Sequence, residues 1–187
     1  MIVLVTGGAK SGKSSFAERY VMHAAEGAVY IATAQIYEEE MRARYERHRE
    51  RRNRSGYAWE TIEEPYELAA TLQEIPGERT ILVDCLTLWA SNWLLKYENE
   101  PDWENRVQDR IEELAAALTA RQGTTVLVTN EVGSGIVPEY PLGRYYRDAA
   151  GGMNQRLASI SDQVFLVTVG IPVELTRLAY RFGGGMR

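Results

Sequence analysis

The sequence predicts an α/β domain with a mostly parallel central sheet flanked by helices. Five short apolar runs lack the polar alternation of half-exposed strands, and segments with helical spacing separate them. Continuous apolar runs are typical of strands that are covered on both faces of a parallel sheet. Strands that alternate with helices along the chain build such sheets. A chain of 187 residues is long enough for one well-buried core, so we expect a single domain.

The five expected strands are rich in Val, Ile, Leu and Thr. In chain order they are Ile2–Thr6, Ala28–Thr33, Thr80–Cys85, Thr125–Asn130 and Gln163–Val169. Two of the intervening segments carry apolar residues on one helical face, so we expect both to be helices. The first, after the first strand, has Phe16, Ala17, Tyr20, Val21 and Ala24 on that face. The second, before the fourth strand, has Val107, Ile111, Leu114, Ala115 and Leu118.

Polar residues stand where four of these strands end. The pairs are Thr6-Gly7, Thr33-Ala34, Asp84-Cys85 and Asn130-Glu131. Ligands of open α/β sheets bind outside the carboxyl ends of the strands. A single polar ending is ordinary, but four of them beside a glycine-rich loop favour a binding site at this edge.

The glycine-rich loop Gly7–Ser14 matches the phosphate-binding pattern G-x-x-x-x-G-K-[ST] at every position. An expected strand precedes it and an expected helix follows it, which is the context that the pattern requires. The backbone amides of such a loop wrap the phosphates, and the helix N-terminus points its partial positive charge at them. We therefore predict one P-loop NTPase domain of the RecA-like class. The predicted nucleotide contacts here are Gly7, Gly8, Ala9, Lys10, Ser11, Gly12, Lys13 and Ser14.

Three side chains have predicted roles in this site. Lys13 can reach the β- and γ-phosphates and acts in catalysis, while the Ser14 hydroxyl can bind Mg²⁺. Asp84 ends the apolar run Ile81–Asp84, the pattern of the second nucleotide-binding motif. A carboxylate there completes a Mg²⁺ site with Ser14.

The composition restricts the functional class. The net charge of −5 does not favour a nucleic-acid partner. Between Arg42 and Arg54, however, seven arginines stand against two glutamates, and such a patch suits a small polyanion such as a triphosphate. The single cysteine excludes an internal disulfide, and no segment predicts a membrane span. We expect a cytoplasmic protein.

The arginine-rich segment also contains His48. If residues 38–52 are helical, Arg44, Arg51 and Arg52 lie beside this imidazole. Such cations lower the pKa of a histidine and keep a lone pair free to attack an electrophile. The alternative is a solvated arginine-rich helix, and spacing alone favours that alternative.

Taken together, these motifs resemble the bifunctional adenosylcobinamide kinase/adenosylcobinamide-phosphate guanylyltransferases of cobalamin biosynthesis. The resemblance extends from Met1 to about Leu175. It depends on Val5–Ser14, Tyr30–Ala34, Met41–Arg44 with His48, Trp59–Glu63, Val83–Trp89, Val128–Pro138, Arg147–Gly151 and Asn154-Gln155. We thus expect residues 1–175 to form the kinase/guanylyltransferase domain and residues 176–187 to be a poorly ordered tail.

The resemblance implies two reactions. ATP or GTP phosphorylates the aminopropanol hydroxyl of adenosylcobinamide, and GTP then transfers GMP through a covalent GMP-histidine to the cobinamide phosphate, giving adenosylcobinamide-GDP and pyrophosphate. His48 matches the guanylylated histidine of the family. The matched GTP contacts are Ala32, Thr33, Ala34, Arg49, Glu50, Arg51, Arg52, Glu63 and Asp84. The resemblance also implies a homo-oligomer, a trimer.

Several alternatives stay open at this stage. A single-activity small-molecule kinase would transfer the γ-phosphate without forming covalent GMP. A RecA-like ATP-dependent binding module would show hydrolysis stimulated by nucleic acid. The sequence leaves open the phosphate donor and whether both reactions share one nucleotide pocket. Trp89 and Trp93 are either core residues or a platform for the corrinoid, and the loop Gly133–Gly143 either closes over substrate or is an ordinary surface loop.

Overall fold

The computed structural model describes residues 1–35, 46, 50, 52 and 54–180. Within this part of the chain, one sheet of seven strands has the order β3-β2-β4-β5-β1-β6-β7. The strands are β1 (Ile2–Thr6), β2 (Gly27–Ala32), β3 (Ala58–Glu63), β4 (Ile81–Asp84), β5 (Thr125–Val128), β6 (Gln163–Thr168) and β7 (Ile171–Glu174). All neighbours are parallel except β6 and β7, which form an antiparallel edge.

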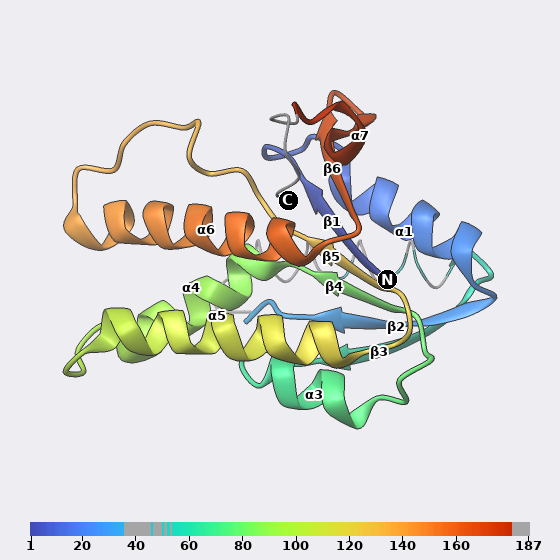
Figure 1. The fold of residues 1–187 in the computed structure, drawn as a ribbon, viewed down its shortest axis with the longest axis horizontal. Helices are drawn as coiled ribbons and strands as arrows, with labels where there is room; N and C mark the ends of the chain where they lie inside the picture. The colour runs from blue at the N-terminus through green and yellow to red at the C-terminus, as the bar shows by residue number, and fades with distance from the viewer. Residues whose placement is uncertain (36–45, 47–49, 51, 53, 181–187) are drawn as a thin grey trace.

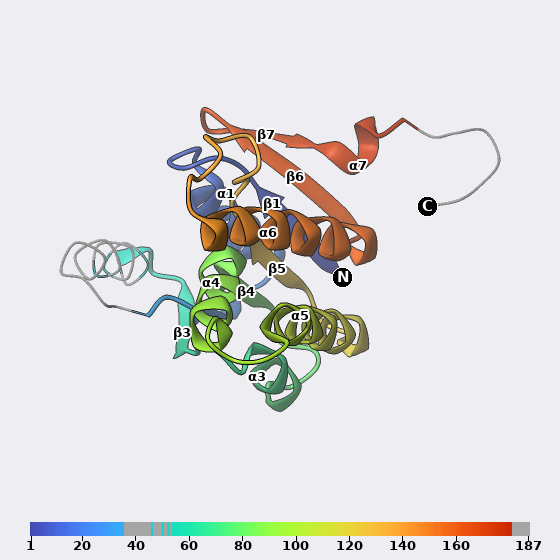
Figure 2. The same ribbon diagram turned by 90° about the vertical axis from the view of Figure 1, so that its left-hand side faces the viewer.

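Helices connect the parallel strands and cover both faces of the sheet (Figures 1 and 2). They are α1 (Lys13–Ala24), α3 (Leu68–Glu74), α4 (Leu86–Tyr97), α5 (Trp103–Ala120), α6 (Pro141–Ile160) and the short α7 (Leu175–Leu178). The predicted α/β class with a mostly parallel sheet is confirmed, as are the two helices expected from their apolar faces.

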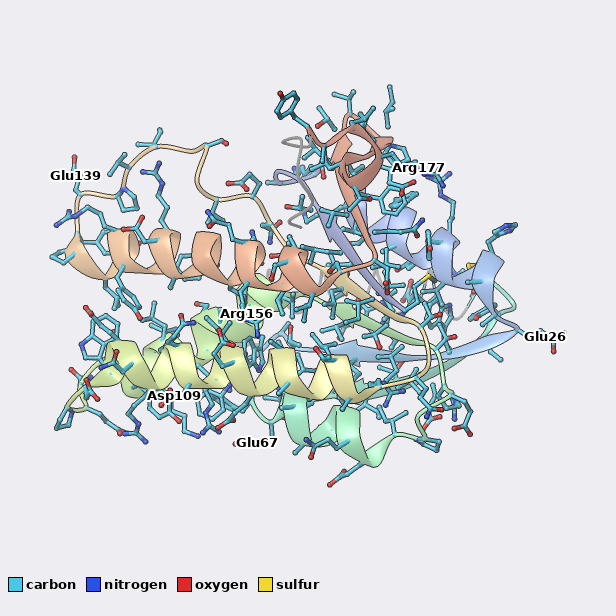
Figure 3. All side chains as sticks on the ribbon, in the orientation of Figure 1. Glu26, Glu67, Asp109, Glu139, Arg156 and Arg177 are labelled. Carbon is cyan, nitrogen blue, oxygen red and sulfur yellow. The ribbon has the colours of Figure 1, made fainter. Side chains whose placement is uncertain are left out.

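Two apolar cores form because successive strand residues point to opposite faces. Leu4 of β1 packs on the face covered by α3, α4, α5 and α6. Its neighbours Val3 and Val5 pack on the opposite face against Ala17 and Val21 of α1. Between α5 and α6, Nε of Arg156 donates to the carboxylate of Glu112 at 2.9 and 3.1 Å (Figure 3).

The aromatic pair on α4 belongs to the core. Trp89 and Trp93 each have 2% of their surface exposed, and both indole N–H groups donate to the carbonyl of Tyr66. This confirms that the two tryptophans are core residues. It contradicts the alternative of a platform for the corrinoid, because both rings are buried and a ligand cannot stack on them.

The five expected strands are all present, with ends that differ by at most two residues. Two strands were missed. The edge strand β3 is half-exposed, so it lacks a continuous apolar run. Strand β7 contains Pro172 and is largely exposed, and proline in a short run argues against a strand except at a sheet edge.

The boundary expected at residue 175 remains a prediction. Helix α7 crosses this position, and Arg177 forms an ion pair with Glu174 at 2.9 Å. Residues 181–187 lie outside the described part of the chain. Among the described helices, none has the length and apolar character needed to cross a membrane.

Candidate active site

The carboxyl ends of the central strands lie at one level across the sheet. Ala32 pairs with Glu63 on one side and with Asp84 on the other. Asp84 pairs in turn with Val128, which pairs with Val5, two residues before the glycine-rich loop. The expectation that the polar strand ends meet at one edge is therefore confirmed, with the loop between Thr6 and α1 at the same edge.

The backbone of the glycine-rich loop requires glycine at two positions. Gly12 caps α1 with φ of 97°, a left-handed conformation that residues with a side chain rarely adopt. A Cβ at Gly7 would lie 2.4 Å from the carbonyl oxygen of Val167. Backbone hydrogen bonds hold the loop on both sides, from Glu131 N to Gly7 O at 3.1 Å and from Gly170 N to Ser11 O at 2.8 Å.

The lysine of the loop is held inside it. Lys13 begins α1, is buried, and its Nζ donates to the carbonyl of Gly8 at 3.1 Å. Ser14 follows on the first turn of α1 and is half-buried. Gly8, Ala9 and Lys10 are exposed at the tip of the loop. The ammonium group of Lys13 therefore lies against the backbone of its own loop.

The acidic end of β4 has a buried tyrosine as its partner. The Tyr30 hydroxyl of β2 donates to Oδ2 of Asp84 at 3.1 Å. Burial raises the pKa of Tyr30 well above its ordinary value, and the nearby Asp84 carboxylate raises it further. The phenol therefore stays protonated and keeps donating to Asp84 at neutral pH. Sequence reasoning assigned no role to Tyr30, although it interrupts an aliphatic run.

Arg52 is buried against the same tyrosine. Only 2% of its surface is exposed, its Cζ lies 3.5 Å from the centroid of the Tyr30 ring, and Nη1 lies 4.0 Å from a carboxylate oxygen of Glu18. In this arrangement the guanidinium group of Arg52 packs against β2 and α1. Nearby, Glu50 is exposed and pairs with Arg54 at 3.5 Å. His48, Arg49 and Arg51 lie outside the described residues.

Thr33 uses its side chain inside the protein. Its hydroxyl donates to the carbonyl of Cys85 at 2.7 Å and accepts from the amide of Cys85 at 2.9 Å. Asn92 Nδ2 donates to the Thr33 carbonyl at 2.8 Å. Thr33 therefore ties the end of β2 to the end of β4. Ala34, the next residue, is half-buried, whereas Ala32 is buried within the strand and Glu63 is exposed.

Cys85 is a packing residue. Burial raises the pKa of its thiol, and the neighbouring Asp84 carboxylate raises it further, so a thiolate is disfavoured at neutral pH. Its sulfur lies 3.2 Å from the Thr87 hydroxyl, which accepts from Asn130 Nδ2 at 2.6 Å. The end of β5 is connected in this way to the start of α4.

With this geometry established, comparison with known proteins decides the family. The family model described as cobinamide kinase / cobinamide phosphate guanyltransferase matches residues 3–175. This match covers almost the whole chain. The chain belongs to this family.

The curated relatives of similar length support the assignment to the cobinamide kinase family. The bifunctional adenosylcobalamin biosynthesis protein CobU of Escherichia coli is 41% identical over 184 residues, covering 94% of this chain and 99% of its own. The protein of the same name from Salmonella typhimurium is 42% identical over 186 residues, with the same coverage. The bifunctional adenosylcobalamin biosynthesis protein CobP of Pseudomonas aeruginosa is 42% identical over 173 residues, covering 92% of this chain and 95% of its own.

A solved structure supports the fold. An ATPase from the type III secretion system of pathogenic bacteria superposes with a TM-score of 0.57 over 95% of this chain and 57% of its own, at 11% sequence identity. At this identity the likeness concerns the fold alone. It agrees with the predicted P-loop NTPase architecture.

Proposed function

We propose that this chain phosphorylates adenosylcobinamide and then transfers GMP from GTP to the phosphorylated product. One observation carries the proposal: in a member of the cobinamide kinase family, an intact phosphate-binding loop, Gly7–Ser14, lies at the same sheet edge as Asp84 and Glu63. The hydrogen-bond donors that can hold a triphosphate therefore lie close to a carboxylate that can bind its Mg²⁺ ion. Both are at the edge where α/β sheets bind ligands.

In the kinase step, the aminopropanol hydroxyl oxygen attacks the γ-phosphorus of ATP or GTP. A phosphorus–oxygen bond forms, the bond to the bridging β–γ oxygen breaks, and the nucleoside diphosphate leaves. Lys13 and the amides of Gly7–Ser14 hold the phosphates and stabilise the charge on the departing oxygens. We propose that residues at the ends of β2 and β3 position the nucleotide, namely Ala32, Thr33, Ala34 and Glu63.

The residues present fit a magnesium ion. Mg²⁺ prefers hard oxygen ligands and is usually bound by only one or two side chains together with substrate phosphates. The Ser14 hydroxyl and the Asp84 carboxylate supply that donor set, and Tyr30 orients the carboxylate. When bound, the ion would neutralise charge on the phosphate oxygens.

In the guanylyltransferase step, His48 is the proposed nucleophile. An imidazole nitrogen attacks the α-phosphorus of GTP, a nitrogen–phosphorus bond forms, and pyrophosphate leaves with the bridging oxygen. An oxygen of cobinamide phosphate then attacks the same phosphorus and releases the histidine. A covalent intermediate of this kind divides one difficult displacement into two easier ones. Arg49, Glu50 and Arg51 are proposed to contact GTP. Arg52, which the family resemblance also matched to a GTP contact, is buried against Tyr30, and we propose that it supports this segment instead.

Labelled nucleotides test both steps. GTP labelled at the α-phosphate should leave covalent label on the protein, and His48→Ala should abolish it. His23→Ala is the matched control, because His23 is the only other histidine and is exposed near the end of α1. Label retained in His48→Ala would rule out this nucleophile. Transfer of γ-label to cobinamide without any covalent GMP would indicate a single-activity kinase, and parallel assays with ATP and GTP identify the donor.

We also propose that the chain is cytoplasmic and self-associates, as a trimer according to the family resemblance. Apolar side chains exposed along the β6–β7 turn, β7 and α7 support an interface between copies. They include Val169 (83% exposed), Ile171 (62%), Leu178 (70%) and Tyr180 (81%). Light scattering of the purified protein should give three times the chain mass, and Leu178→Lys should lower it. A monomeric wild-type protein would contradict this proposal.

A further inference from the structure

A pocket lies between α6 and the strands β1 and β6, on the face of the sheet opposite α1. Figures 1 and 2 both show α6 alongside β1. The pocket has a volume of about 520 Å³, within the range of small-molecule sites. The apolar part of its lining consists of Leu4, Ala158, Val164 and Leu175.

One end of the pocket adjoins the phosphate-binding loop. Thr6 lines the pocket and directly precedes Gly7. Its Oγ1 is buried and has no hydrogen-bond partner among the described residues. Glu131 also lines the pocket, and its backbone amide donates to the Gly7 carbonyl at 3.1 Å. The Glu131 carboxylate accepts from the Gly133 amide at 2.7 Å through Oε1. A ligand in the pocket would therefore meet a carboxylate near the phosphate-binding loop.

The wall made by α6 is polar and firmly placed. Its side chains in the pocket are Arg147, Asp148, Asn154 and Gln155. Asn154 accepts from the Thr129 hydroxyl at 2.7 Å and donates to the Asn130 carbonyl at 3.1 Å, which fixes α6 to the end of β5. Arg147 donates to the Gly133 carbonyl at 2.5 Å and fixes the loop after β5. Such a wall offers donors and acceptors to a ligand rich in amides.

Two glycines interrupt this helix at the pocket. Gly151 and Gly152 lie in the interior of α6, where glycine is less stable than alanine. A Cβ at either position would meet no atom within 4 Å, so packing inside the protein does not require them. Bare helix backbone beside an open volume is what a closely approaching ligand needs.

We propose that this pocket binds the alcohol-bearing arm of the phosphoryl acceptor together with the amide groups next to it, while the rest of a larger acceptor lies outside its open mouth. The inference rests on the proposed function, which supplies adenosylcobinamide as that acceptor. The aminopropanol hydroxyl lies at the Thr6 and Glu131 end, and the amide side chains contact the α6 wall. Glu131 accepts the hydroxyl proton as the oxygen attacks the γ-phosphorus and the nucleoside diphosphate leaves. The proton then passes to solvent.

Gly152→Leu tests the pocket by filling it. Leucine is a better helix former than glycine, so the variant should unfold at the same or a higher temperature. Equilibrium dialysis with cobinamide should show at least a 10-fold weaker affinity, while labelling by α-labelled GTP without acceptor stays within twofold of wild type. Ser159→Leu is the control, since Ser159 is exposed on the same helix and does not line the pocket.

Glu131→Gln tests the role of the carboxylate. Loss of a general base typically lowers kcat by roughly 100-fold or more. We expect that loss in the kinase assay with an unchanged KM for cobinamide and unchanged GMP labelling. Glu139→Gln is the control, since Glu139 is exposed on the loop before α6 (Figure 3) and does not line the pocket.

The outcomes separate the two proposals. If wild-type protein neither binds nor phosphorylates cobinamide, the proposed function fails. If the wild type is active and Gly152→Leu binds cobinamide equally well, the pocket inference alone is wrong. A Gly152→Leu protein with normal cobinamide affinity and an altered mass by light scattering would assign the pocket to contact between copies and would likewise overturn it.

Discussion

The guanidinium group of Arg52 lies over the ring of Tyr30, with Cζ 3.5 Å from the ring centroid. The hydroxyl of the same ring donates to Asp84 at 3.1 Å. One side chain of β2 therefore contacts both Arg52 and the carboxylate proposed to bind Mg²⁺.

Replacement of Arg52 should weaken the fold. Arg52→Ala removes a buried cation from Tyr30 and leaves Glu18 without this partner, and we expect a loss of about 2 kcal/mol in the free energy of unfolding. Denaturant titration measures it. Arg54→Ala is the comparison, because the Arg54–Glu50 pair is exposed and should contribute less than ~0.5 kcal/mol. Equal losses in the two variants would contradict the anchoring role of Arg52.

Tyr30→Phe should act on the metal. The variant keeps the ring beneath Arg52 and removes only the hydrogen bond to Asp84. Partners that orient a metal-binding carboxylate typically contribute about 10-fold or more to affinity. The Mg²⁺ concentration for half-maximal kinase activity should therefore rise by about that factor, while GTP binding without metal is retained. If Tyr30→Phe requires the same Mg²⁺ concentration as wild type, Tyr30 does not contribute to metal binding.

Two glycines of the phosphate-binding loop should respond differently to alanine. Gly7→Ala places a Cβ 2.4 Å from the Val167 carbonyl oxygen and should destabilise the protein, by about 2 kcal/mol as for other overpacked sites. At Gly8 a Cβ meets nothing within 4 Å, so the thermal midpoint of Gly8→Ala should match wild type. Its affinity for GTP should still fall, because the new methyl group enters the space of the phosphates. Thermal unfolding and nucleotide titration of both variants test this pair.

Thr33→Val distinguishes a structural role of the Thr33 hydroxyl from a direct contact with the nucleotide. Valine keeps the shape but removes the hydroxyl that bonds both backbone groups of Cys85. Leaving these groups unpaired should lower the free energy of unfolding by about 2 kcal/mol. A variant that loses GTP affinity at unchanged stability would instead indicate a direct contact between the hydroxyl and the nucleotide.

Alkaline pH should destabilise the protein through Tyr146. Burial raises the pKa of Tyr146 to about 12 from 10.0. Because the folded protein keeps this proton after the unfolded chain has lost it, the contribution is complete below pH ~10 and disappears as the pH rises to about 12. It amounts to roughly 3 kcal/mol. Denaturant unfolding between these pH values should therefore show a shallower decline for Tyr146→Phe than for wild type.

The central strands and the phosphate-binding loop could be predicted because their signals are local. Strands β1, β2, β4, β5 and β6 are continuous apolar runs, and Gly7–Ser14 is a contiguous motif with a defined flanking structure. Strands β3 and β7 were not predicted, because these edge strands are partly exposed and therefore lack a continuous apolar run. The short β7 also carries Pro172, and its antiparallel pairing with β6 is not visible in a run of four residues.

The role of Thr33 shows why site residues are harder to predict. A threonine at a strand end is equally compatible with nucleotide contact and with a clamp between strands. Its partner is the backbone of Cys85, 52 residues away, and pairing across the sheet brings the two together. Tyr30 and Glu131 are similar, since their significance depends on Asp84 and Gly7, which are distant in sequence.

The neighbours of β1 determine when the nucleotide site can form during protein synthesis. β1 pairs with β5 and β6, so Ile2 meets Thr125 and Val5 meets Phe165. The loop that follows is held by Gly170 as well. The phosphate-binding motif is therefore synthesised before the strands that support it, and more than a hundred further residues must be added before the first of them is present. A nascent chain released before β6 should not bind GTP, although every residue of the motif is present.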